Sequence, residues 1–168
     1  PNSYSDPTNI EAKSQVLLAS TIAGFAFALS GTALVHSLSH PMTAWFHVPH
    51  GVANAVLLPY IIEYNLIANF DKYAEIARIF DEETRRISKF AAAEKLVGYL
   101  KQFSQQLSIP KNFRYLDVTI NSEMIERLAE DAMDDKGTIP NNPRKPVKED
   151  IIAIYQQVLP QYQSTSTR

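Results

Sequence analysis

All four histidines of this chain, His36, His40, His47 and His50, fall within fifteen consecutive positions. They lie in a stretch from residue 14 to residue 62 that contains no Asp, Glu, Lys or Arg, although charged residues make up 20% of the whole chain. Histidine is a common metal ligand and a proton carrier near neutral pH. Four imidazoles in the least charged part of a chain therefore indicate a buried chemical site.

The convergence of His36, His40 and His50 in one uncharged region favours metal binding there. His36 and His40 are four residues apart, which places both imidazoles on one face of a helix, where they can share a metal or divide metal binding and proton transfer. His50 stands between Pro49 and Gly51, so a rigid turn holds its backbone. The alternative is that these are helix caps or hydrogen-bonded core histidines. We expect His47, in the aromatic link before Pro49, to be partly exposed.

The elements that position the histidines are predicted to be helices. A capping-box pattern at Thr8 and Glu11 predicts a long helix over residues 9–39, which Pro41 should end. A second apolar helix is expected over residues 51–64, with Pro59 as a kink or an early stop. Amphipathic spacing or helix-start signals predict further helices over residues 68–80, 87–107, 122–133 and 149–159. The intervening segments 81–86, 111–120 and 134–146 are expected to be links or loops.

This pattern predicts an all-α fold, a bundle of six or seven helices around the long uncharged helix. The expected organisation is an extended lead-in over residues 1–8, one metal-binding domain over residues 9–160 and a polar tail over residues 161–168. Residues 15–35 carry no charge over a length that would span a membrane. Their many small and polar residues favour a buried core helix over a membrane span.

Composition narrows the class of protein. The 168 residues suffice for one domain, and the formal net charge of −2 argues against a nucleic-acid partner. The absence of cysteine excludes disulfides and thiolate metal sites. The polar start has no signal-peptide pattern, so we expect a cytoplasmic protein with no membrane partner.

The stretch GTALVHSLSHPMTAWFHVPHGVANAVLLP, residues 31–59, resembles the signature of the iron-containing (group III) alcohol dehydrogenases. That signature has a His, a second His four residues later, and then a Pro-His-Gly-Val-x-Asn-Ala turn. Residues 11–27 and 143–159 also resemble the helix before the signature and the C-terminal helix of the family. The resemblance covers about residues 9–160.

The resemblance implies the helical, dehydroquinate synthase-like C-terminal domain of an NAD(P)-dependent alcohol dehydrogenase. It implies that His36 and His50 bind the metal, Fe²⁺ or Zn²⁺ in its place. It places His40 near nicotinamide and substrate, as a candidate for proton handling. The implied substrate is a small alcohol or aldehyde, and the implied reaction interconverts a primary or secondary alcohol and its carbonyl compound.

Half of such an enzyme has no counterpart in this sequence. The five glycines form no GxGxxG or GGGS-like phosphate loop, and the family's other two metal ligands, an Asp and a His, lie upstream of the matched region. We therefore expect this chain to be inactive alone, either as a fragment or as the product of a gene for this half. The alternative is a free-standing helical module that binds a metal or a partner. Exposure of the face that covers the cofactor predicts self-association or a homo-oligomer. A metal-dependent hydrolase is disfavoured because no carboxylate lies close to His36 or His40 in the sequence.

Overall fold

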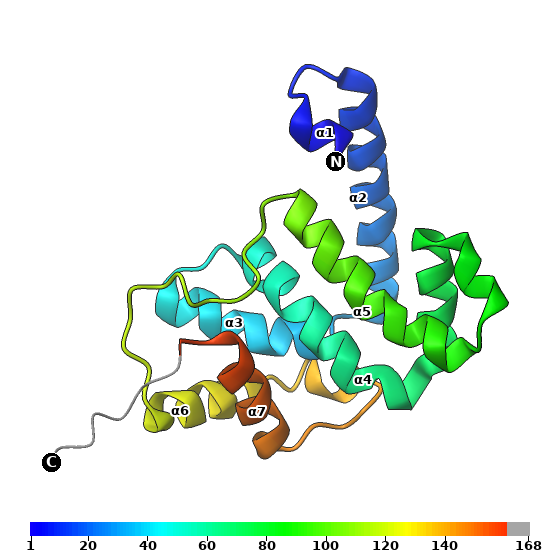
Figure 1. Cartoon of the computed structure of the whole chain (residues 1–168). Coiled ribbons are helices and arrows are strands. Elements are labelled where there is room, and N and C mark those ends of the chain that lie inside the picture. Colours follow the sequence, from blue (N-terminus) through cyan, green and yellow to red (C-terminus); the bar gives the residue numbers. More distant parts are fainter. Residues whose placement is uncertain (161–168) are drawn as a thin grey trace, which may run out of the picture.

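A computed structural model describes residues 1–160, and the predicted polar tail at 161–168 lies outside the described residues. Within the described part the chain is all-α, as predicted, and has no strand (Figure 1). The helices are α1 (Asn2–Ser5), α2 (Ile10–Ser30), α3 (Leu34–Phe46), α4 (His50–Phe80), α5 (Lys89–Gln106), α6 (Ser122–Met133) and α7 (Lys148–Val158), with 3₁₀ turns η1 (Glu82–Arg86) and η2 (Ile139–Asn141).

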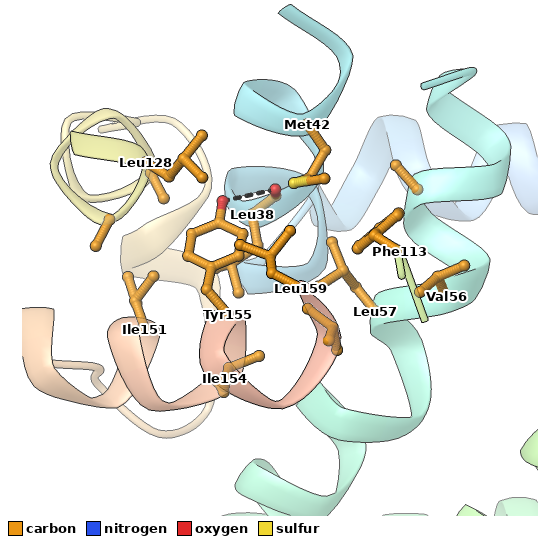
Figure 2. Packing of buried hydrophobic residues seen from close by; sticks show 14 of the residues in the cluster. Leu38, Met42, Val56, Leu57, Phe113, Leu128, Ile151, Ile154, Tyr155 and Leu159 are labelled. Carbon is orange, nitrogen blue, oxygen red and sulfur yellow. Dashed lines mark hydrogen bonds between the residues drawn. The ribbon is translucent and has the colours of Figure 1, made fainter. Parts of the chain in front are cut away.

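The main core lies between α3, the first half of α4, α6 and α7 (Figure 2). Its largest fully buried side chain is Tyr155 of α7, whose hydroxyl donates a hydrogen bond of 2.8 Å to the carbonyl oxygen of Leu38. The long loop after α5 is held to this core because the backbone N–H of buried Phe113 donates to the Val158 carbonyl at 2.8 Å. The core therefore fixes α3, which carries His36 and His40, from several sides.

A smaller second core joins the later part of α4 to α5. The residues expected to form two helices, 51–64 and 68–80, form one element, α4, with Pro59 buried inside it and a kink at Asn69, where φ is −157° and ψ is 48°. A buried amide pair ties this helix to the loop after α6. Asn65 donates to Asn142 at 2.9 Å, and Asn142 donates back at 2.8 Å.

The long uncharged helix does not occupy the centre of the bundle, contrary to the prediction. None of the residues of α2 is buried, and α2 extends away from the other helices with α1 folded against its start (Figure 1). The expected extended lead-in is also partly wrong, because residues 2–5 form the single turn α1. A helix that is apolar on all sides needs partners on several sides. The described residues do not supply these partners, and lack of charge alone could not reveal that.

The predicted helix over residues 9–39 is two helices, and Pro41 does not end the second. Gly31 separates them with a φ of 70°, and a Cβ atom there would lie 2.8 Å from Nδ2 of Asn141. Asn141 Nδ2 donates to the Thr32 carbonyl at 2.9 Å, so the break is held from the far loop. Pro41 lies inside α3 and is buried. Burial of α3 against the core offsets the roughly 3 kcal/mol that an interior proline costs.

Two helices, α2 and α4, are long and apolar enough to cross a membrane by length and composition. Of the residues in the apolar 18-residue segment of α4, 39% are buried inside the protein, whereas none in the corresponding segment of α2 is buried. The core helix of a soluble protein can have the same length and composition as a membrane span. Length and composition therefore do not decide whether α2 crosses a membrane or packs against protein.

Candidate metal centre

Three of the four histidines meet where α3 runs past the start of α4. His36 and His40 lie one turn apart on α3, and the chain then reverses through His47, whose φ of 53° ends that helix, so that His50 begins α4. The ring centroids lie 5.2 Å apart for His36 and His50, 5.4 Å for His40 and His50, and 6.2 Å for His36 and His40. The predicted convergence is therefore present. His47 is exposed, in agreement with the prediction.

The hydrogen bonds of Ser39 define which nitrogen of His50 carries the proton. The Ser39 hydroxyl donates to the carbonyl oxygen of His36 at 3.0 Å, and its oxygen lies 3.4 Å from Nδ1 of His50. Since that hydroxyl proton is committed to His36, Nδ1 of His50 donates to the Ser39 oxygen. Nε2 of His50 then carries a lone pair, which is the form of imidazole that binds a metal.

Asn54 joins His36 and His50. It lies one turn after His50 on α4, and its Nδ2 atom is 3.0 Å from Nε2 of His50 and 3.5 Å from Nε2 of His36. Both Nε2 atoms therefore face one point, and the N–H groups of the amide offer partial positive charge there. This arrangement fits a cation, because two imidazole lone pairs converge on a shared position.

The surroundings of His36 favour the neutral form of its imidazole. Burial lowers the pKa of His36, and repulsion from His50 and His40 lowers it further, while Asp135 acts in the opposite direction. The unprotonated ring is the ligand form, so the environment favours the state that a metal needs.

His40 has a different partner. Its Nδ1 atom lies 2.9 Å from Oδ2 of Asp135, which comes from the loop after α6, and the His40 side chain is 51% exposed. A carboxylate at one ring nitrogen fixes the orientation of an imidazole and leaves the other nitrogen free to exchange a proton. His40 therefore contacts Asp135, whereas His36 and His50 contact Asn54.

Sequence reasoning missed both of these partners. Asn54 could have been found, because it is four residues after His50 and must share its helix face. Asp135 could not, because 95 residues separate it from His40. Among residues 1–160, no group of three or more His, Cys, Asp and Glu side chains could hold a metal ion.

An open hollow of about 560 Å³ adjoins His36 between the end of α2 and the start of α4. Its lining is mainly apolar and includes Phe27, Val35 and Leu58, while His36 and Asn54 contribute polar atoms. A few polar groups on an apolar wall are typical of small-molecule sites.

Solved structures of alcohol dehydrogenases have this helical arrangement. A crystal structure of 1,3-propanediol oxidoreductase matches 90% of this chain with a TM-score of 0.84 and 37% identity. The alcohol dehydrogenase from Oenococcus oeni matches 91% with a TM-score of 0.83 and 37% identity. The matches cover 39% of each of those chains. The fold of this chain is therefore that of one part of these dehydrogenases.

Sequence comparison defines the family. The model of the Fe-containing alcohol dehydrogenase family, C-terminal part, matches residues 1–159. The 1,3-propanediol dehydrogenase of Klebsiella pneumoniae is 37% identical over 150 residues, and the lactaldehyde reductase of Escherichia coli is 36% identical over 145 residues. The chain belongs to the Fe-containing alcohol dehydrogenase family and corresponds to its C-terminal domain. The matched regions take in 89% and 86% of this chain. They correspond to 38% and 37% of the lengths of the two relatives.

Proposed function

We propose that this chain is the metal-binding portion of an NAD(P)-dependent alcohol dehydrogenase, with His36 and His50 as metal ligands. The observation that carries the proposal is the convergence of both Nε2 atoms on Asn54, at 3.5 and 3.0 Å. Fe²⁺ is the proposed metal, with Zn²⁺ as the alternative. When bound, the metal would act as a Lewis acid on the oxygen of an alcohol or carbonyl compound.

Other residues of this chain would bind the substrate and exchange its proton. The hollow beside His36 would hold the carbon skeleton of a small primary or secondary alcohol or its aldehyde or ketone, because its wall is mainly apolar. His40, held by Asp135 at 2.9 Å, would exchange the proton of the alcohol. NAD(P) would accept the hydride and would need protein beyond this chain for its binding. We place the intact enzyme in the cytoplasm.

The first test of this proposal measures metal content. The purified chain should bind Fe²⁺ or Zn²⁺, and His36→Ala should lose most of that metal because only one converging imidazole remains. His47→Ala is the matched control, since His47 is exposed and outside the cluster. Equal metal content in the native chain and in His36→Ala would contradict the ligand assignment.

The second test measures turnover. The chain alone should show no NAD(P)-dependent oxidation of propanol or propanediol, because the cofactor domain and two metal ligands of the family have no counterpart in this sequence. Robust turnover by the purified chain would contradict the proposal that this chain is one portion of the enzyme and needs further protein to bind NAD(P).

The alternative function is a free-standing helical module that binds a metal or a partner without dehydrogenase activity. The exposed α2 favours this reading, because its large apolar side chains would recruit other protein surface. We propose that the isolated chain self-associates through α2. Co-production with a nucleotide-binding half from a relative separates the two functions, since only the dehydrogenase gains activity.

A further inference from the structure

A second hollow, of about 490 Å³, lies between α4, α5 and the loop that follows α5. The two helices pack against each other (Figure 1), and α5 ends in a turn at Ser108, where Ile109 donates to the Ser104 carbonyl at 3.0 Å. The Tyr60 hydroxyl of α4 donates to the Lys111 carbonyl at 3.2 Å and ties the loop to that helix. Three connected segments therefore hold the walls of this space, which we call the α4–α5 hollow.

The walls of the α4–α5 hollow differ in chemistry. Hydrocarbon comes from α4 and from the start of the loop, including Ala55, Val56, Pro59, Ile109 and Pro110. Polar groups come from α5 and from the next residues of the loop, including Lys101, Ser104, Gln105, Lys111 and Asn112. An apolar wall together with a few polar side chains fits a small molecule that has a hydrocarbon part and a polar end.

The charges around this hollow favour an anion. Nζ of Lys101 lies 5.4 Å from the centroid of the Tyr60 ring, and Lys111 comes from the loop. In the described part of the chain, neither lysine forms an ion pair with a carboxylate. Burial raises the pKa of the Tyr60 hydroxyl, the charge of Arg114 lowers it, and the charge of Glu63 raises it. Arg114 thus adds a third cation to this surface and Glu63 one carboxylate, so the polar end of a ligand here would be negatively charged.

Gly98 leaves the α5 side of the hollow open. It lies inside α5, where glycine is less favourable than alanine. A Cβ atom at this position would meet no atom within 4 Å, so no neighbour among the described residues requires a glycine. Gly98 lines the α4–α5 hollow, and a ligand that occupies the hollow gives a physical reason for the missing side chain.

We propose that the α4–α5 hollow binds a small carboxylate with a short hydrocarbon chain, at a site separate from the histidine centre. The carboxylate accepts hydrogen bonds from Lys101 and Lys111, and the hydrocarbon chain lies against Val56 and Pro59. A singly charged carboxylate fits better than a phosphate ester, because α5 ends beside the hollow and the partial negative charge of a helix C-terminus disfavours a dianion. This binding goes beyond the proposed dehydrogenase function and needs no metal.

The test is a titration of the full 168-residue chain with hexanoate at constant ionic strength, followed by calorimetry and by the backbone amide signals in nuclear magnetic resonance. Hexanoate should bind with a dissociation constant on the order of 1 mM, as expected for so few ligand atoms. It should shift the amide signals of Gly98 and Ser104. Hexanamide has the same chain without the charge, and inorganic phosphate has charge without hydrocarbon, so each should bind at least about 10-fold more weakly.

Three variants locate the site. Lys101→Met keeps an aliphatic stem and removes the charge, so it should weaken hexanoate binding by about 5- to 10-fold. Lys95→Met is the matched control, because Lys95 is exposed on the same helix and does not line the hollow. Gly98→Leu places a side chain in the open space and should abolish binding, while leucine, a better helix former than glycine, keeps α5 folded.

The proposed site would be overturned by absence of hexanoate binding to the native chain, by equal binding of hexanamide or phosphate, or by full binding in Gly98→Leu. Amide shifts at Val35 and Gly51 in place of Gly98 would also overturn it, because those residues line the hollow beside His36. His36→Ala separates this site from the metal centre, since it should lose metal and still bind hexanoate as the native chain does. Loss of hexanoate binding in that variant would place the anion at the histidines. Far-ultraviolet circular dichroism monitors the folding of each variant.

Discussion

The hydroxyl of Tyr155 reaches from α7 to the backbone between the two histidines of α3. It donates to the carbonyl oxygen of Leu38 at 2.8 Å, and both residues are fully buried (Figure 2). Burial raises the pKa of Tyr155, so the hydroxyl remains protonated and available as a donor. The C-terminal helix therefore supports the segment that carries His36 and His40, although it contributes no residue to the metal centre.

Tyr155→Phe should lower the free energy of unfolding by about 1 kcal/mol, the usual net value of a buried hydrogen bond. Urea denaturation followed by circular dichroism measures the change. Tyr115→Phe is the control, because the Tyr115 side chain is 52% exposed. Equal midpoints for the native chain and Tyr155→Phe would show that the hydrogen bond adds no stability.

A second tyrosine gives a prediction for acid stability. Tyr99 of α5 donates to Oδ2 of Asp81 at 2.6 Å, and this hydrogen bond, followed by that from the Glu83 backbone, lowers the pKa of Asp81 below 3.8. A carboxyl with a lowered folded-state pKa stabilises the fold above its unfolded pKa, and this contribution is lost as the pH falls through the folded pKa.

Tyr99→Phe should therefore be less stable than the native chain at pH 6, and the difference should shrink as the pH falls below about 3.8. Urea midpoints measured between pH 3 and pH 6 give the comparison. A difference that stays constant across this range would mean that the hydroxyl acts independently of the charge on Asp81.

The sequence was sufficient for the features that depend on local spacing. Helices over 87–107, 122–133 and 149–159 follow from amphipathic spacing or helix-start signals, and the structure contains them within a few residues. The helix expected over 68–80 corresponds to the part of α4 that follows the kink at Asn69. His36, His40 and His50 could be grouped because they lie within one turn-linked pair of helices. The same local logic explains the N-cap of α6, where Asn121 accepts from the Met124 backbone at 2.8 Å.

The predictions that were wrong concern features that depend on contacts with residues distant in the sequence. The break at Gly31 is secured by Asn141, and the orientation of His40 by Asp135, and no local pattern reveals either contact. Pro41 was expected to end a helix, but tertiary burial outweighed its local cost. The position of α2 depends on what covers it, which its own composition does not specify.

The exposed apolar surface of α2 predicts concentration-dependent self-association. Leu18 and Phe25 are 61% and 70% exposed on this helix. The double variant Leu18→Glu/Phe25→Glu should shift the chain toward monomer in sedimentation velocity, because it places charge in the apolar surface. Ile79→Glu is the matched control, since Ile79 is 82% exposed on α4. A native chain that is monomeric at all concentrations would exclude self-association through α2.

The C-terminal end of α5 has a position, Ser108, at which a substitution should stabilise the fold. Ile109 donates its backbone N–H to the Ser104 carbonyl at 3.0 Å and Ser108 donates to the Gln105 carbonyl at 3.1 Å, which is the Schellman arrangement of a helix end. That arrangement places Ser108 at a φ of 58°, where glycine has no steric cost and serine does.

Ser108→Gly should therefore raise the free energy of unfolding by roughly 1 kcal/mol, which corresponds to about 2–4 °C in melting temperature for a chain of this size. Gly98→Ala should also stabilise α5 by about 1 kcal/mol, because a Cβ atom there meets nothing within 4 Å. Ser104→Gly, inside the same helix, should act in the opposite direction, since helical φ gives glycine no advantage and adds its entropic cost. Calorimetric melting of the three variants tests this reversal of sign, and destabilisation by Ser108→Gly would contradict the strain assigned to that position.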